Sequence, residues 1–248
     1  MRSSYGIFAK YYDVLTGNID YGKRALYFNE LVHRFGGNQH GILLDLACGT
    51  GSLSEEMSRL GYDVIAVDNS QEMLSAAIDK KFESGSNIQY LCQDMCELDM
   101  FGTIDVTICA LDSLNHLDSI EAVRKVFSRV HLFCEPGGLF IFDINTEYKH
   151  RMVLGENTFV YDTDDVYCVW QNSCSGSKVT IDLDFFVPQG DSYRRYEESF
   201  CENAYSLNMI REELENVGFS VLACYDGDSF DPPAQESQRV VFVAGKSK

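Results

Sequence analysis

Short apolar runs alternate with segments of helical spacing along the chain as far as residue 145. The runs are almost wholly apolar, which is typical of strands buried on both faces of a sheet. They occupy residues 42–46, 63–67, 88–92, 104–110 and 138–144. Helices are expected between them, and five buried strands with helical crossovers predict a doubly wound, mostly parallel α/β sheet.

The predicted helices have recognisable ends. The first ends at Gly61, in the position of a C′ glycine, and the second begins at Asn69 or Ser70. The third begins at Asp118, because Asp118 and Glu121 have the spacing of a capping box. Its apolar positions then recur at helical spacing, at Ile120, Val123, Phe127 and Val130.

A different pattern occupies residues 157–205, where apolar and polar residues tend to alternate. Clusters of Gly and Ser, and of Pro, Gly and Asp, separate the runs, so we expect a small insertion of three antiparallel strands. A helix at 207–217 and strands at 220–226 and 239–245 then complete a seven-stranded, Rossmann-like sheet.

One domain with an insertion follows from these patterns. Residues 1–146 and 206–248 are expected to form a ligand-binding domain, with residues 1–40 as an N-terminal helical cap, and residues 147–205 form the β insertion.

Composition narrows the possible partners. The formal charge is −18, from 38 acidic and 20 basic residues, so nucleic acid and anionic membrane surfaces are poor partners. Neither a signal sequence nor an apolar run of about 20 residues is present, and we expect a soluble protein. The nine cysteines include no CxxC pair, so we expect reduced thiols, a cytoplasmic location and no bound metal.

The turn after the first strand has the features of a ligand site. Gly49 and Gly51 let backbone amides approach a ligand closely, and Asp68 at the end of the second strand is placed to bind ribose hydroxyls. An adenosine ligand is the natural inference. A dinucleotide fits less well, because Ser54 replaces the third glycine of GxGxxG and Asp45 favours a cationic ligand over a pyrophosphate.

Five segments in order resemble the class I methyltransferases that use S-adenosylmethionine (SAM) and act on small molecules. They are LDLACGTG, VIAVDNSQEML, QYLCQDMCEL, IDVTICALDSLNHL and PGGLFIFDI, within residues 40–145, and GF…RVVFVAGK resembles the family's final antiparallel pair. The resemblance implies a SAM-binding methyltransferase domain with the β insertion after its fifth strand.

The resemblance also implies which residues bind SAM. Residues around the methionine portion, the ribose and the adenine are, in chain order, Asp45, Ala47, Gly49, Gly51, Asp68, Asn69, Ser70, Met73, Asp94, Met95 and Ala110. Tyr12 and Tyr21 lie in a segment that folds over the cofactor in such enzymes. The alternatives are that the glycines serve only a tight turn, Asp68 caps a helix, and the methionines and tyrosines pack in the core.

Methyl transfer is an in-line displacement, so positioning of the two reactants matters most. Where a proton must also be removed, the segment ALDSLNHL offers His116 as a proton acceptor, with Asn115 and Asp112 beside it. Tyr12 is the third candidate catalytic residue. The other histidines, His33, His40, His131 and His150, are expected to be exposed to solvent.

The insertion is expected to supply the acceptor pocket or a dimer surface. Its notable side chains are Trp170, Phe185, Tyr196 and Glu198, which could equally pack the small sheet onto the parent domain. The sequence thus predicts a methyltransferase acting on N or O of a small molecule, as a monomer or homodimer. A non-catalytic SAM-binding protein and an NAD(P)-dependent oxidoreductase are the alternatives. The absence of an (N/D)PP(Y/F) segment after the fourth strand disfavours a nucleic-acid methyltransferase.

Overall fold

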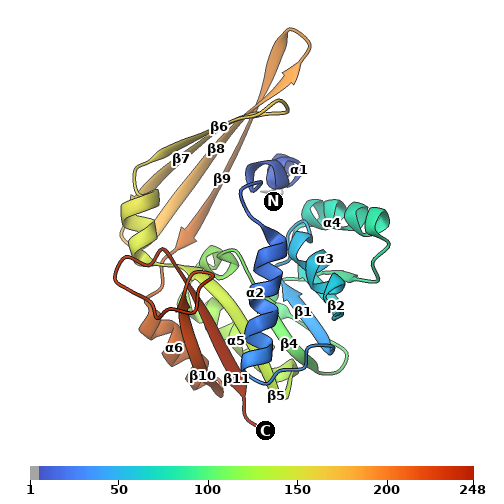
Figure 1. Ribbon diagram of the computed structural model, residues 1–248. Coiled ribbons are helices and arrows are strands. Elements are labelled where there is room, and N and C mark those ends of the chain that lie inside the picture. The colour runs from blue at the N-terminus through green and yellow to red at the C-terminus, as the bar shows by residue number, and fades with distance from the viewer. Residues whose placement is uncertain (1–5) are drawn as a thin grey trace.

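The computed structural model describes residues 6–248 and contains two sheets (Figure 1). The larger has the strand order β10-β11-β5-β4-β1-β2-β3, with β10 and β11 antiparallel and the other five strands parallel to one another. Its strands are β1 (Ile42–Leu46), β2 (Asp63–Asp68), β3 (Gln89–Cys92), β4 (Ile104–Cys109), β5 (Cys134–Asn145), β10 (Phe219–Asp226) and β11 (Arg239–Lys246). The predicted doubly wound, mostly parallel sheet of seven strands is confirmed.

Helices cover both faces of this sheet. Buried side chains of α2 and α3, such as Phe28 and Met57, pack on one face, and those of α5 and α6, such as Phe127 and Leu214, pack on the other. The helices are α1 (Gly6–Leu15), α2 (Tyr21–Arg34), α3 (Ser52–Arg59), α4 (Gln71–Ser84), α5 (Ile120–Phe133) and α6 (Leu207–Asn216). Within residues 6–248, none of the helices has both the length and the apolar character needed to cross a membrane.

Local caps account for where these helices begin. Ser70 precedes α4 and accepts a hydrogen bond from the Met73 amide, which agrees with the predicted start of the second helix. At α5 the prediction is wrong by one residue. Ser119, in an extended conformation, accepts from the Ala122 amide, because the capping side chain must directly precede the first helical residue. Asp118 is therefore outside the helix and does not form a capping box with Glu121.

The β insertion has four strands, one more than the sequence predicted. They are β6 (Thr158–Asp162), β7 (Tyr167–Ser175), β8 (Lys178–Gln189) and β9 (Ser192–Asn203), joined as an antiparallel meander. The segment that reads as one strand, residues 158–175, is split by a tight turn. In that turn the backbone and hydroxyl of Thr163 exchange hydrogen bonds with Val166.

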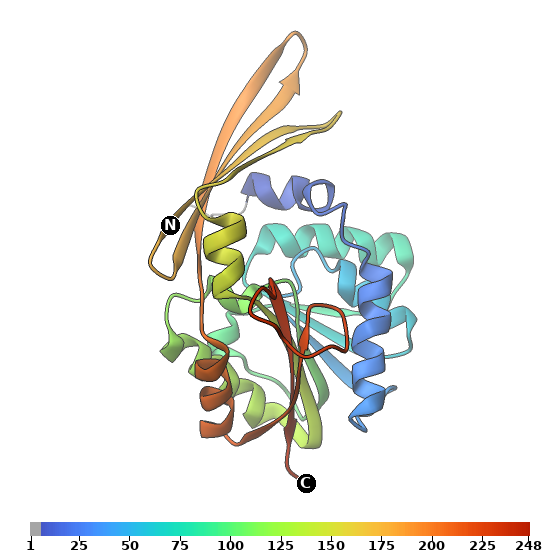
Figure 2. The ribbon, with the colours of Figure 1, turned by 60° about the vertical axis from the view of Figure 1, so that its left-hand side comes forward.

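Helix α1 lies between the small sheet and α4, as both ribbon views show (Figures 1 and 2). Its start is fixed by Glu198 of β9, whose Oε1 accepts hydrogen bonds from the amides of Ile7 and Phe8 at 2.7 and 2.9 Å. The Phe8 and Tyr11 rings pack against Phe185 of β8. A third apolar cluster therefore joins α1 to the insertion.

Candidate active site

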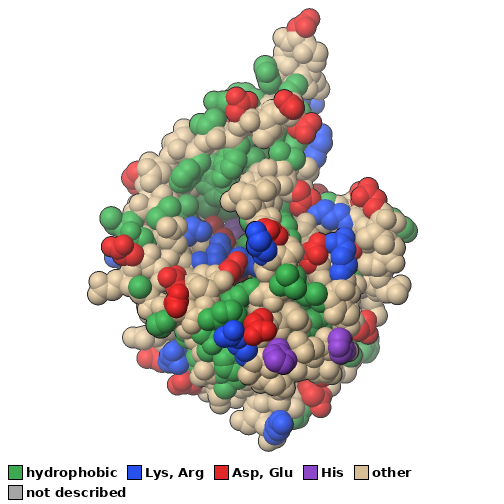
Figure 3. Space-filling view, viewed as in Figure 1, with side chains coloured by type: hydrophobic (Ala, Val, Ile, Leu, Met, Phe, Trp, Pro, Cys, Tyr) green, Lys and Arg blue, Asp and Glu red, His purple; other side chains and the backbone are tan. Residues whose placement is uncertain are grey.

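A cavity of about 730 Å³ lies beyond the carboxyl ends of β1, β2 and β4. The chain turns in opposite directions along the sheet from β1 and β4, so this is the switch point at which open α/β sheets bind ligands. Figure 3 shows hydrophobic side chains on the small sheet above a hollow in which Lys and Arg side chains lie. A second cavity of about 40 Å³ adjoins it, sharing Tyr12, Ala47, Gly49, Leu111 and Ser113 with the first.

The turn after β1 brings backbone to the cavity wall. Ala47 has a φ of 60° and Gly49 a φ of 55°, so the chain reverses sharply as it leaves the sheet. A Cβ added at Gly49 would meet no atom within 4 Å, because this glycine faces open space. The surroundings of Gly51, whose φ is 74°, are crowded. A Cβ added at Gly51 would lie 2.4 Å from the hydroxyl oxygen of Tyr90. Gly51 lines neither cavity and faces Tyr90.

Asp45 lies in the wall of the smaller cavity and is 2% exposed. The hydroxyl of Ser54 donates a 2.5 Å hydrogen bond to its Oδ2, so the serine that replaces the third glycine has a structural use here. Burial raises the pKa of the Asp45 carboxyl to about 7, an effect that Ser54 partly opposes.

Asp68 closes β2 and lies in the wall of the large cavity. Its Oδ2 accepts a hydrogen bond from the Gly49 amide at 2.8 Å, and its Oδ1 accepts one from the Ser70 amide at 2.9 Å. Burial raises the pKa of Asp68 although these amides favour its ionised form. Each oxygen retains a lone pair, so the carboxylate can also accept hydrogen bonds from ligand hydroxyls.

Beyond Asp68 the cavity wall continues along the ends of β2 and β3. Asp94 accepts from the Cys96 amide at 2.7 Å and so caps the 3₁₀ turn Met95–Glu97. This part of the wall consists of Asn69, Ser70, Met73, Gln93, Asp94, Met95 and Cys96. The five of them that the sequence predicted as cofactor-binding residues therefore meet in one place.

The end of β4 forms a strained corner on the other side of the cavity. Leu111 and Asp112 have φ angles of 58° and 56°, which non-glycine residues rarely adopt. Asp143 of β5, fully buried, accepts hydrogen bonds from both of their amides at 2.9 and 2.8 Å. It also forms ion pairs with Arg24 and Arg239, and Arg239 in turn pairs with Asp112. These contacts hold the corner in place.

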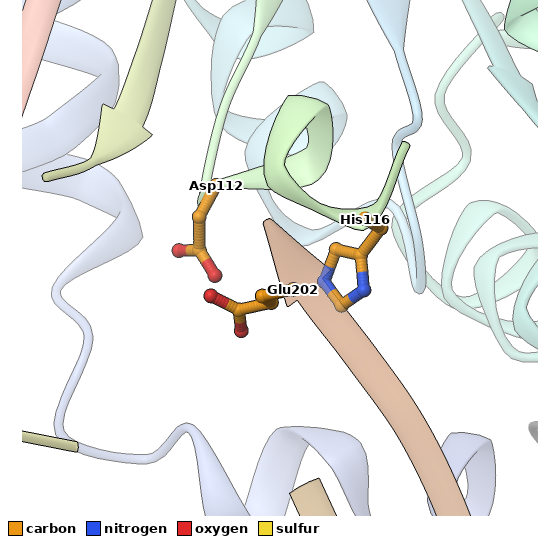
Figure 4. Close-up of side chains that lie close together, drawn as sticks. All are labelled: Asp112, His116 and Glu202. Carbon is orange, nitrogen blue, oxygen red and sulfur yellow. The ribbon is translucent and has the colours of Figure 1, made fainter. Parts of the chain in front are cut away.

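His116 follows this corner and lies near Glu202 of β9 (Figure 4). The ligand atoms of Asp112, His116 and Glu202 lie within 4.8 Å of one another. Glu202 is 4% exposed, and its Oε2 accepts from Asn145 Nδ2 and lies 3.0 Å from His150 Nε2. Burial opposes ionisation of Glu202, but the hydrogen bonds with His150 and Asn145 and the nearby His116 together outweigh it and lower the pKa of this carboxyl.

Two expectations for this region need correction. His150 is not exposed; it is 1% exposed and bonded to Glu202, because the π-helix Lys149–Leu154 turns it inward. Asn115 is buried, its amide group donates to the carbonyls of Asn145 and Asn203, and its oxygen accepts from the Asn145 amide. Asn115 lines neither cavity and ties β5 to β9, so we do not assign it a catalytic role.

Helix α1 and the insertion complete the upper wall. Tyr12 lines both cavities and Tyr21 the smaller one, and burial raises the pKa of both phenols. Of the four insertion residues that the sequence singled out, Trp170 lines the large cavity. Phe185 is in the core beneath α1, Arg194 covers the Tyr196 ring, and Glu198 caps α1.

The structure therefore brings most of the predicted site together. All predicted site residues except Gly51 and Asn115 line one of the two cavities. Sequence reasoning missed the buried charges Arg24, Asp143 and Glu202 and the half-buried charges Lys149 and Arg239. Their signal was weak: an acid inside the apolar run of β5 and an arginine at the first position of β11. The nine cysteines, all within the described residues, are free thiols.

Known proteins share this architecture. Residues 43–138 match the model of the family described as methyltransferase domain. Over 97% of its length the chain is 31% identical to YqeM of Bacillus subtilis (strain 168), whose name assigns it to the methyltransferases, and it covers 96% of that protein. It is 27% identical to a glycine/sarcosine N-methyltransferase of Halorhodospira halochloris, over 74% of this chain and 67% of that one.

A solved structure agrees over the whole fold. The crystal structure of an S-adenosylmethionine-dependent methyltransferase from Clostridium acetobutylicum ATCC 824 superposes with a TM-score of 0.89 at 33% identity, over 98% of this chain and 99% of that one. Fold and site define a Rossmann-like methyltransferase. The chain belongs to the class I SAM-dependent methyltransferases, and SAM is its cofactor.

The residues present fit that cofactor. Gly49 leaves open space where a side chain would protrude, and the Asp68 carboxylate beside it is held by backbone amides with lone pairs to spare. Asp45 offers the smaller cavity a carboxyl group suited to a cationic group, and the wall of the large cavity around Met95 offers apolar surface suited to a flat base. Together these groups offer partners to each part of SAM.

Proposed function

We propose that this protein transfers the methyl group of SAM to N or O of a small molecule bound between the β4 corner and the insertion. One observation carries the proposal: a single cavity runs from Asp68 and Asp94 at one end to His116, Trp170 and Glu202 at the other. Such a cavity offers the cofactor and the acceptor adjoining places in one continuous volume. The glycine/sarcosine N-methyltransferase relative, as named, also acts on small molecules, which supports an acceptor of this size.

We assign roles along this cavity. Asp68 binds the ribose, Asp94 and Met95 border the adenine, and the backbone at Ala47 and Gly49 together with Asp45 surrounds the methionine portion. Asn69, Ser70, Met73 and Ala110 complete this part of the wall. Residues 147–205 supply part of the acceptor pocket through β7 and β9.

When bound, SAM supplies an electrophilic methyl group on a sulfonium. The protein's contribution is mainly positional: Leu111 and Tyr12 enclose the space between the two ends of the cavity and exclude water. Good alignment of reactants is worth roughly 7–11 kcal/mol of the barrier. His116 can accept the proton that the acceptor loses, a contribution of about 10² to 10⁴ in rate.

The cofactor assignment is tested by thermal unfolding with SAM, S-adenosylhomocysteine and NADH. A ligand at about 100 times its Kd stabilises the protein by roughly 2.7 kcal/mol, which raises the Tm by about 5–10 °C for a chain of this size. We expect this shift with both SAM species, and we expect Asp68→Ala to abolish it.

Asp63→Ala is the matched control, since Asp63 is exposed at the opposite end of the same strand. This variant should keep the full shift. A shift with NADH alone would contradict SAM as the cofactor. An unchanged shift in Asp68→Ala would show that the ribose does not lie where we place it.

A further inference from the structure

Two carboxylates face one another at the acceptor end of the cavity. Asp112 follows β4 and Glu202 lies near the end of β9, so residues 90 positions apart in sequence are brought together with His116. Figure 4 shows the carboxylate of Glu202 pointing toward that of Asp112, with a ring nitrogen of His116 directed toward the same space. Two carboxylates this close repel each other unless a positive charge lies between them.

One oxygen of each carboxylate is already bonded. Arg239 Nη2 donates to Asp112 Oδ1 at 2.5 Å, and Asn145 and His150 bond Glu202 Oε2. No hydrogen bond from residues 6–248 reaches Asp112 Oδ2 or Glu202 Oε1. These donors therefore fix the orientation of both carboxylates and leave each with an accepting oxygen.

Charges in the surroundings favour a monovalent cation. Arg239 is adjacent to Asp112, and Lys149 lines the cavity with its ammonium on Asn145 Oδ1 at 2.9 Å, so a divalent ion would lie close to other positive charges. Among residues 6–248, Glu202 forms no ion pair with an arginine or a lysine, and its hydrogen-bond partners are Asn145 and His150. One added positive charge would give Glu202 an ion-pair partner.

We propose that Asp112 and Glu202 bind the ammonium form of an amine acceptor and that His116 removes its proton. This rests on the proposed function and narrows it to N-methylation. The ammonium N–H bond breaks and its proton goes to a ring nitrogen of His116, so the nitrogen regains a lone pair. That pair forms the bond to the methyl carbon as the carbon–sulfur bond breaks, and the sulfonium becomes a neutral thioether.

The surrounding side chains favour an amine on a compact, ring-bearing skeleton. Phe200 lies beside the cluster, with its ring 5.4 Å from that of His116 between centroids, and Trp170 lines the same cavity. An alcohol of the same shape carries no charge and forms no ion pair with either carboxylate. The structure therefore predicts discrimination between an amine and its matched alcohol.

Three matched pairs test this: benzylamine with benzyl alcohol, cyclohexylamine with cyclohexanol, and glucosamine with glucose. Each is added to the protein with S-adenosylhomocysteine to measure the Tm, and with SAM to measure methylated product by mass. We expect at least one amine to raise the Tm and to be methylated at least tenfold faster than its alcohol. Equal rates for the pair, or no response to any of the three amines while SAM still stabilises the protein, would overturn the amine site and leave the cofactor assignment standing.

Variants of the two carboxylates test whether these side chains bind the amine. Asp112→Asn and Glu202→Gln should each raise KM for the amine at least tenfold while the SAM-induced Tm shift stays unchanged. Glu197→Gln, an exposed acid on the same strand as Glu202, is the matched control and should leave KM unaltered. An unaltered KM in both cluster variants contradicts the proposal. So does methylation that EDTA abolishes and Mn²⁺ restores, because the cluster would then hold a metal ion.

Discussion

The two ends of the cavity are built in different ways. At the cofactor end the decisive contacts join residues close in sequence: the Gly49 amide donates to Asp68, 19 residues away, and the Cys48 amide donates to the carbonyl of Val67. At the acceptor end, Arg239 reaches Asp112 across 127 positions, and Asn115 reaches Asn203 across 88. One end is a local β-α-β unit and the other is an assembly of distant segments.

Because of this difference, the stability of each end of the cavity depends on a different property of its residues. The cofactor end rests on backbone geometry, so it is sensitive to the size of a side chain at a glycine. The acceptor end rests on buried charges that compensate one another, so it is sensitive to the loss of a single charge. Substitutions chosen at each end should therefore fail for different reasons and by different amounts.

The largest effect is expected at the acceptor end, from Asp143→Ala. This change leaves Arg24 and Arg239 without their shared buried partner and removes the acceptor of the Leu111 and Asp112 amides. Breaking a buried ion pair on one side typically costs about 3–5 kcal/mol. Urea unfolding measures the loss, with Glu56→Ala, which removes an ion pair with Arg59 on the surface of α3, as a control that should lose less than about 1 kcal/mol.

A loss for Asp143→Ala as small as that of the control would show that the β4 corner is stable without its charge network. The contrast between the two ends would then be one of sequence distance alone.

A smaller loss is expected at the cofactor end, from Gly51→Ala. The φ of 74° disfavours any side chain, and the new Cβ would lie 2.4 Å from the Tyr90 oxygen, so we expect a destabilisation of about 2–4 kcal/mol. Gly49→Ala is the comparison: its φ is 55° but its surroundings are open, so strain alone costs about 1 kcal/mol in the ligand-free protein.

Making Gly51→Ala in a Tyr90→Phe protein separates the two causes of its destabilisation, which are the strained backbone and the clash with the Tyr90 hydroxyl. Removing the hydroxyl takes away the closest contact, so Gly51→Ala should cost less there than in the wild type. If the cost is the same in both backgrounds, the backbone conformation and not the clash determines it.

The sequence was informative where structure is local. The order of the strands and helices along the chain, the Ser70 cap and the positions of Asp45 and Asp68 at the ends of β1 and β2 follow from apolar runs and glycine turns. The cap of α5 was misplaced by one residue, because Asp118 and Ser119 are both good capping residues and only the observed conformation of Ser119 decides between them.

The sequence was uninformative where structure is assembled from afar. In the sequence, Glu202 and Arg239 look like ordinary surface charges, and His150 was expected in solvent. Their burial depends on which strand ends meet: β11 pairs with β5, which places Arg239 opposite Asn145, and the π-helix turns His150 toward β9. The apolar periodicity of one segment does not predict which distant segment will pack against it. At the acceptor end, the sequence therefore predicted Asp112 and His116, which lie in one segment, but not Glu202 or Arg239, which come from distant strands.

The smallest effect, and the sharpest comparison, concerns Asp45 and pH. Burial raises the pKa of this carboxyl to about 7, so in the ligand-free protein it is protonated below pH 7 and ionised above it. A cationic methionine portion favours the ionised form, and binding must then release the proton at low pH. We expect SAM affinity to be constant above about pH 7.5 and to fall by up to about tenfold per pH unit below pH 7, about 1.4 kcal/mol for each unit.

Isothermal titration between pH 5.5 and 8.5 measures this dependence, with Asp45→Asn as the control. Asparagine still accepts the Ser54 hydrogen bond but cannot titrate, so its affinity for SAM should be lower at pH 8 and flatter with pH than that of the wild type. His116 and Asp68 remain in both proteins, so the difference between the two curves isolates Asp45. Parallel curves would mean that the carboxyl does not respond to the cofactor's charge, and the methionine portion would then have to lie away from the smaller cavity.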